Sequence, residues 1–233
     1  MPNHDWIEAL PRNRLICEFS AWSADLTRLA DEMARIAPHV DVLHVDVADG
    51  HFAPALLYFP DLVAQLRKIV KAPIHTHLMV KDEILLDQIE QFADAGSDLI
   101  SIHVENADVA REALDLLDRR GIAAGMVLKV DAPLDSVLPW LPRLRFVTLL
   151  GTAIGIKGVG LDENALGRLT AMRKLIAESG VAHRIVLASD GGNREETVPL
   201  KWKAGGETVV LGSLAFNAPD LGQRMAWLHG LQA

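Results

Sequence analysis

Four residues of types that commonly bind divalent metal ions stand in or just after apolar segments of this 233-residue sequence. His44 and Asp46 lie in VDVLHVDV, His77 lies in PIHTHLMV, and Asp190 directly follows HRIVLAS. Imidazole nitrogens and carboxylate oxygens together suit Zn, Fe(II), Mn or Co, and the lack of a thiolate in the set argues against a structural zinc site. If the fold gathers these residues, they form one divalent metal site.

The spacing of the polar residues within two of these segments indicates where they point. His44 and Asp46 are two residues apart, as are His75 and His77 in the next segment, so each pair lies on one face of a strand. His77 is nearer the C-terminal end of its strand and is the better ligand, with His75 one layer deeper. Taken singly, each His is better explained as a hydrogen-bonded core residue and each Asp as a helix N-cap. The combination of all four favours a metal site.

Strand-like and helix-like segments alternate along the chain. Eight short runs rich in Val, Ile and Leu predict strands at 15–20, 40–47, 73–80, 98–104, 123–130, 144–150, 183–189 and 207–212. Segments with apolar residues at spacings of three and four predict helices, among them ADLTRLADEMARIA, LVAQLRKIV, EILLDQIEQFADA, DVAREALDLLDRR and ENALGRLTAMRKLIAES. This alternation predicts a single (β/α)8 TIM barrel, with an open doubly wound sheet as the alternative. No G-x-G-x-x-G follows the first strand, which favours the barrel.

The barrel is expected to form one domain over residues 1–233, because no Pro/Gly/Ser-rich linker divides the chain. The amphipathic DWIEAL within residues 1–13 predicts an N-terminal extension or a segment that covers the barrel bottom. Active sites of such barrels form at the C-terminal ends of the strands. The expected metal site therefore lies at the barrel mouth.

Composition excludes several classes of partner. The formal net charge is −8 and the Lys and Arg residues are scattered, which argues against nucleic-acid binding. No apolar stretch approaches the roughly 18 to 20 residues of a membrane span, so no membrane association is expected. The single Cys17 and an N-terminus without an apolar signal run predict a cytoplasmic protein.

Several motifs resemble those of the ribulose-phosphate 3-epimerase family, in the same order and over about residues 15 to 218. They are SAWSAD at 20–25, HVDVADGHF at 44–52, HLM at 77–79, HVE at 103–105, DGG at 190–192 and GSLAF at 212–216. The resemblance implies a metal-dependent barrel enzyme that inverts C3 of a phosphorylated ketose. It places His44, Asp46, His77 and Asp190 at the positions of the metal ligands.

The resemblance also implies roles for other residues. Asp46 and Asp190 match the two carboxylates that remove and return the C3 proton through an enediolate, as general base and general acid. Ser20 and Met79 match residues near the substrate, for which a cap or turn role and a packing role, respectively, are the alternatives. Gly191, Gly192, Gly212 and Ser213 match the phosphate-binding loops after strands seven and eight. Barrels of this family assemble into dimers or larger rings, which implies a homo-oligomer.

This chain departs from the family pattern at the loop after the sixth strand. The family carries a glycine-rich N/P-G-F-G-G-Q loop there, where this chain has LGTAIGIKGVG at 150–160, with Gly155 retained and Lys157 as a possible new substrate contact. Ala48 stands where the family commonly has Met. Lys129 stands where the family usually has Asn, and its alternative roles are a substrate contact, a Schiff-base nucleophile or a solvated strand end. These changes predict a ketose phosphate other than ribulose 5-phosphate.

Two other functions fit the same barrel. A carbon–carbon lyase or decarboxylase would use the metal or Lys129 to stabilise an enediolate. A catalytically inactive sugar-phosphate sensor would keep the fold and lose turnover, since fold alone does not establish activity. Retention of both Asp46 and Asp190 counts against the sensor.

Overall fold

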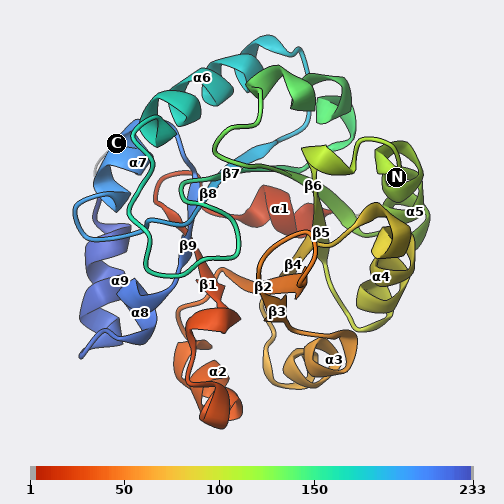
Figure 1. Cartoon of the computed structure of the whole chain (residues 1–233). Coiled ribbons are helices and arrows are strands. Elements are labelled where there is room, and N and C mark those ends of the chain that lie inside the picture. Colours follow the sequence, from red (N-terminus) through yellow and green to blue (C-terminus); the bar gives the residue numbers. More distant parts are fainter. Residues whose placement is uncertain (1–3, 232–233) are drawn as a thin grey trace.

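The structure is a computed structural model that describes residues 4–231, and Figure 1 shows their parallel strands closed into a barrel. The strands of the barrel are β1 (Ile16–Ser20), β2 (Val42–Asp49), β4 (Ile74–Met79), β5 (Leu99–His103), β6 (Ala123–Leu128), β7 (Phe146–Leu150), β8 (Val186–Asp190) and β9 (Thr208–Leu211). Each pairs in parallel with the next, and β1 pairs with both β9 and β2, which closes the ring. The predicted (β/α)8 TIM barrel is confirmed. A short strand, β3 (Leu56–Leu57), runs antiparallel to the end of β2.

Helices surround the barrel, between successive strands and after the last one (Figure 1). They are α2 (Leu29–Ile36), α3 (Pro60–Ile69), α4 (Asp82–Asp94), α5 (Ala110–Arg120), α6 (Ala165–Glu178), α7 (Val198–Lys203), α8 (Ser213–Phe216) and α9 (Leu221–His229). The connection from β6 to β7 is a 3-10 segment, Leu134–Arg143, with two prolines inside it. Proline lacks the N–H that an α-helix interior requires, which accounts for the different geometry there. No helix among residues 4–231 has the length and apolar character needed to cross a bilayer.

Alternate side chains of each strand face the helices and the barrel interior. Outward-facing Phe19, Val45 and Leu78 pack with helix residues such as Met33 and Phe92 in the main apolar core. Burial of this layer is the main stabilising contribution to the barrel. The inward-facing positions of the strands are not part of this outer apolar layer, so they can hold other residue types.

The bottom of the interior is apolar and is covered by α1 (Asp5–Ala9). Ile7 and Leu10 pack against the first inward-facing residues of the strands, among them Ile16 and Phe146. The Arg184 guanidinium donates hydrogen bonds to three carbonyl oxygens of this segment. This cover closes the barrel at the end opposite the mouth.

The middle layer of the interior is polar. Barrel interiors are usually filled by Val, Ile and Leu, but this layer holds Glu18, His44, His75, Ser101, Thr148 and Thr208, all buried. Gly125 is required beside them, because a Cβ there would lie 2.0 Å from the Ser101 Oγ. Buried polar groups are stabilised by hydrogen bonds. Hydrogen bonds connect Glu18, His44, His75, Ser101 and Thr208 in this layer, while the Thr148 Oγ1 has no partner among the described residues. The hydrogen bonds of this layer therefore determine how the layer above it is oriented.

Candidate metal centre and active site

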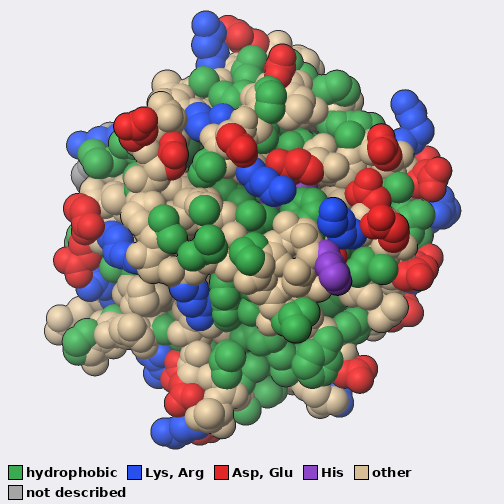
Figure 2. Space-filling view, in the orientation of Figure 1, with side chains coloured by type: hydrophobic (Ala, Val, Ile, Leu, Met, Phe, Trp, Pro, Cys, Tyr) green, Lys and Arg blue, Asp and Glu red, His purple; other side chains and the backbone are tan. Residues whose placement is uncertain are grey.

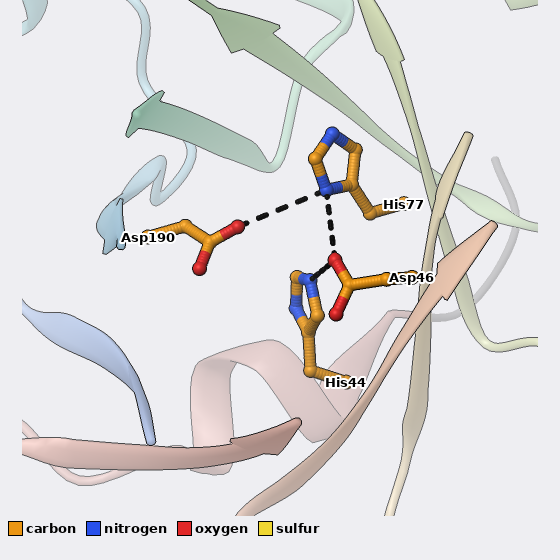
Figure 3. Close-up of side chains that lie close together, drawn as sticks. All are labelled: His44, Asp46, His77 and Asp190. Atoms are coloured by element: carbon orange, nitrogen blue, oxygen red, sulfur yellow. Dashed lines mark hydrogen bonds and ion pairs between the residues drawn. The ribbon is translucent and has the colours of Figure 1, made fainter. Parts of the chain in front are cut away.

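Above this polar layer, Asp46, His77 and Asp190 converge on the side chain of His44, which belongs to the layer (Figure 3). One ligand atom from each lies within 4.8 Å of the others. The Asp46 Oδ1 is 3.2 Å from His44 Nε2 and 3.3 Å from His77 Nδ1. The Asp190 Oδ2 approaches the same His77 nitrogen at 3.8 Å. Strand register explains part of this, because Asp46 on β2 is the direct neighbour of His77 on β4.

Glu18 fixes which nitrogen of His44 faces this cluster. Its Oε2 lies 3.0 Å from His44 Nδ1 and 2.7 Å from His75 Nδ1, in a site with no solvent exposure. The two imidazoles hold the pKa of Glu18 far below its ordinary value, although burial alone would raise it. An ionised carboxylate only accepts hydrogen bonds, so His44 must donate from Nδ1. In the neutral imidazole the His44 Nε2 then carries a lone pair that faces Asp46.

A second hydrogen-bonded chain orients His77 in the same way. The His77 Nε2 is 2.8 Å from the Nε2 of His103, whose Nδ1 lies 3.3 Å from the Glu105 carboxylate. Burial lowers the pKa of His103 to about 3, so this ring is neutral. Because His103 donates from Nδ1 to Glu105, its Nε2 accepts the proton of His77. In the tautomer with its proton on Nε2, the His77 Nδ1 carries a lone pair that faces Asp46 and Asp190.

The converging atoms fit a divalent cation. Two imidazole lone pairs and two carboxylate oxygens meet at one place, while the other Asp46 oxygen accepts a 2.8 Å hydrogen bond from Ser20. Such atoms repel one another unless positive charge lies between them. In the chain alone a proton can supply that charge: against the effect of burial, Asp46 raises the pKa of His44 well above its ordinary value. The N₂O₂ donor set is suited to Zn, Fe(II), Mn or Co.

The cluster opens into a cavity of about 390 Å³ at the barrel mouth. The predicted site residues that line it are Ser20, Asp46, His77, Met79, Gly155, Lys157, Asp190, Gly191, Gly192, Gly212 and Ser213. His44 lies beneath them with no exposed surface. A cavity of this size suits a small ligand with several polar groups.

Comparisons with known proteins show which family this chain resembles. The sequence profile described as the ribulose-phosphate 3 epimerase family matches residues 16–216. A ribulose-phosphate 3-epimerase of Escherichia coli K12 is 34% identical over 205 residues, which cover 86% of this chain and 88% of that protein. Those of Synechocystis and Bacillus subtilis are 31% and 28% identical, covering 89% and 91% of this chain and 90% and 96% of those proteins, respectively.

The chain belongs to the ribulose-phosphate 3-epimerase family. It is therefore an isomerase, an epimerase that acts on carbohydrates. The resemblance drawn from its sequence motifs is confirmed by the match.

The loop at 151–160, where this member differs from the family pattern, crosses in front of the barrel (Figure 1). Lys157 donates a 2.6 Å hydrogen bond to the Trp22 carbonyl, and its ammonium lies 4.5 Å from the centre of the Trp22 ring. Ile156 and Val159 are exposed on the same loop, and hydrophobic side chains lie over this part of the face in Figure 2. The loop is thus tied across the cavity to the segment after β1.

Lys129 lies away from the epimerase cavity. Its ammonium is 3.9 Å from the Glu105 carboxylate and 4.2 Å from the centre of the Phe52 ring. It lines a separate hollow with these two residues and does not contribute to the lining of the main cavity. Its contact is therefore with the outer end of the chain that orients His77.

The sequence patterns did not identify the residues that orient the ligands. Glu18 stands in an otherwise apolar strand. A charged residue at an inward-facing position requires a buried partner, and this was the signal that could have identified Glu18. Asn193 and Lys201, described below, carried no comparable signal. Their sequence context does not distinguish them from exposed loop and helix residues.

We expect Glu18→Gln to weaken divalent metal binding about tenfold or more, because the His44 ring loses the charge that holds its Nδ1 proton. Competition with a chromophoric chelator measures this affinity directly. Thr208→Val is a matched control, since Thr208 contacts the other Glu18 oxygen at 3.2 Å and leaves the His44 contact in place. Equal affinity in Glu18→Gln and the unmodified protein would refute the assigned role.

Proposed function

We propose that this enzyme inverts C3 of a phosphorylated ketose in a metal-dependent reaction with two carboxylates as proton carriers. The observation that carries the proposal is the meeting of Asp46, from β2, and Asp190, from β8, at the floor of one cavity. These strands belong to different walls of the barrel, separated on both sides by other strands. Carboxylates that approach from different walls can serve opposite faces of one carbon.

The proposed roles follow from the two environments. Although burial alone would raise it, His44 and His77 hold the pKa of Asp46 well below its ordinary value. Burial, and then the charge of Asp46, raise the pKa of Asp190. Paired carboxyl groups with separated proton affinities are suited to act as base and acid. Asp46 removes the C3 proton, Asp190 returns one to the opposite face, and the roles exchange in the reverse direction.

The cation would be held by His44, Asp46, His77 and Asp190. When bound, it would supply positive charge next to the negative charge that develops on the enediolate oxygens. Ser20 keeps Asp46 oriented through its 2.8 Å hydrogen bond. Met79 adds an apolar wall that limits access of water.

The proposed phosphate subsite is formed by the loops after β8 and β9. Gly191 and Gly192 have φ values of +85° and +66°, which residues with a side chain rarely adopt. With Gly212 and Ser213 they line the cavity, where backbone N–H groups can bind an anion. Lys157 lies at the edge of the same cavity, so we propose it as a further substrate contact when the loop moves.

The test is an activity screen of the metal-loaded protein against phosphorylated tetruloses, pentuloses and hexuloses. We expect turnover of at least one of them, accompanied by exchange of the C3 hydrogen with solvent deuterium. The altered loop favours a substrate other than ribulose 5-phosphate, and high turnover of ribulose 5-phosphate would disprove that choice. Absence of exchange across the whole panel would disprove epimerisation and favour a sugar-phosphate sensor. The position of Lys129 outside the cavity gives no support to a Schiff-base lyase.

A further inference from the structure

Lys201 on α7 is an ammonium group buried beneath the proposed phosphate loop. It has no exposed surface, and its Nζ donates 2.6 Å hydrogen bonds to the Gly191 carbonyl and to the Asn193 Oδ1. Neither acceptor carries a charge. Lys201 does not line the cavity, whereas Gly191 and Asn193 do, so the loop separates this ammonium from the bound ligand.

Lys201 has no directly contacting carboxylate within the described part of the chain: Asp190 attracts its charge without forming an ion pair, and the Arg194 charge opposes it. No carboxylate of residues 4–231 forms an ion pair or a hydrogen bond with its Nζ, and burial lowers the pKa of Lys201 to about 7. Lysine is rarely buried without an anionic partner, because removing an ammonium from water costs free energy that neutral acceptors only partly return. An anion on the other side of the loop would compensate this charge.

The peptide between Gly191 and Gly192 lies between Lys201 and the cavity. In a trans peptide the C=O and the following N–H point in opposite directions, and the described chain contains no cis peptide bond. The Gly191 carbonyl points to Lys201, so the Gly192 N–H points away from it. That N–H donates to no acceptor within residues 4–231, and Gly192 lines the cavity. Lys201 thus holds an unpaired donor in position and polarises it.

We propose that Lys201 is a positioning residue whose buried ammonium compensates the charge of the substrate phosphate through the Gly191–Gly192 peptide. The proposal rests on the phosphorylated substrate proposed above. In this proposal the Lys201 charge contributes to phosphate binding although its side chain does not contact the ligand. The exposed Lys203 on the same helix has no such relation to the loop.

The test compares Lys201→Met and Lys201→Gln with Lys203→Met, which removes the same charge from the surface of the same helix. In the metal-loaded enzyme we expect both Lys201 variants to raise KM for the ketose phosphate about tenfold or more with a smaller change in kcat. Turnover of the same ketose without its phosphate should not change. Calorimetry with inorganic phosphate should show a matching loss of affinity, and Lys203→Met should behave as the unmodified protein.

Circular dichroism identifies which Lys201 variants keep the native fold, and Gln retains a hydrogen-bond donor where Met does not. Unchanged phosphate affinity in a folded Lys201 variant would overturn the proposal. Equal losses with the phosphorylated and unphosphorylated ketose would also overturn it, since a general structural role predicts them. If no ketose phosphate is turned over, the proposed function fails, and phosphate calorimetry still decides the role of Lys201.

Discussion

Asp46→Asn and Asp190→Asn are each expected to lower kcat/KM for the ketose phosphate about 1,000-fold or more, because each would remove one of the two proposed proton carriers and a proposed metal ligand. Asn preserves the size of the side chain, so the cavity keeps its shape. The two variants should differ from inactive protein in one respect. The carboxylate that remains can still remove the C3 proton of one epimer, so solvent deuterium enters that epimer without inversion.

The measurement combines steady-state kinetics with deuterium incorporation followed by NMR, starting from each epimer. Metal content is determined in parallel, so that loss of the cation is distinguished from loss of proton transfer. Asp162→Asn is the control, since the Asp162 carboxylate accepts a local hydrogen bond from the Asn164 N–H and does not line the cavity. Rapid inversion by either variant with Asp162→Asn unaffected would exclude the two-carboxylate mechanism.

Removal of the divalent metal is expected to abolish turnover and to lower the melting temperature. Three of the candidate ligands, His44, Asp46 and His77, are buried, Asp190 is partly buried, and several come within hydrogen-bonding distance of one another. A cation that binds them only in the folded state would stabilise that state. Chelation followed by elemental analysis prepares the metal-free protein. Adding back Zn, Fe(II), Mn or Co in turn then measures which ion restores activity. Full activity in protein proven to be metal-free would contradict the proposed cofactor.

His44→Ala provides the matched variant for this experiment. His44 has no exposed surface and does not line the cavity, so its loss leaves the substrate contacts in place. We expect its activity to require a higher metal concentration than the unmodified enzyme. A metal dependence identical to that of the unmodified enzyme would remove His44 from the ligand set.

The fold was predictable because its signals are local. Strands such as residues 73–80 and helices such as 83–95 show their own hydrophobic period, and their alternation leaves few topologies. The candidate ligands were predictable for a related reason. Spacings of two residues place His44 with Asp46 on one face, and the ends of parallel strands meet at one mouth.

The residues that orient the ligands were not predictable in this way. Glu18 and His75 are 57 positions apart, and their contact depends on how the closed ring places β1 near β4. The segment PLKWK likewise does not reveal that Lys201 is buried and Lys203 exposed, because α7 is too short to show a clear period. Such contacts depend on tertiary register and not on local pattern.

The candidate ligands lie on β2, β4 and β8, and β8 is separated from β4 by three strands on one side and from β2 by β9 and β1 on the other. A cation held by all four side chains would therefore brace opposite walls of the barrel against each other. Strand pairing alone connects these walls only around the circumference. The proposed metal centre would in this way also cross-link strands on opposite sides of the barrel, so loss of the ion would increase the mobility of the strands at the mouth.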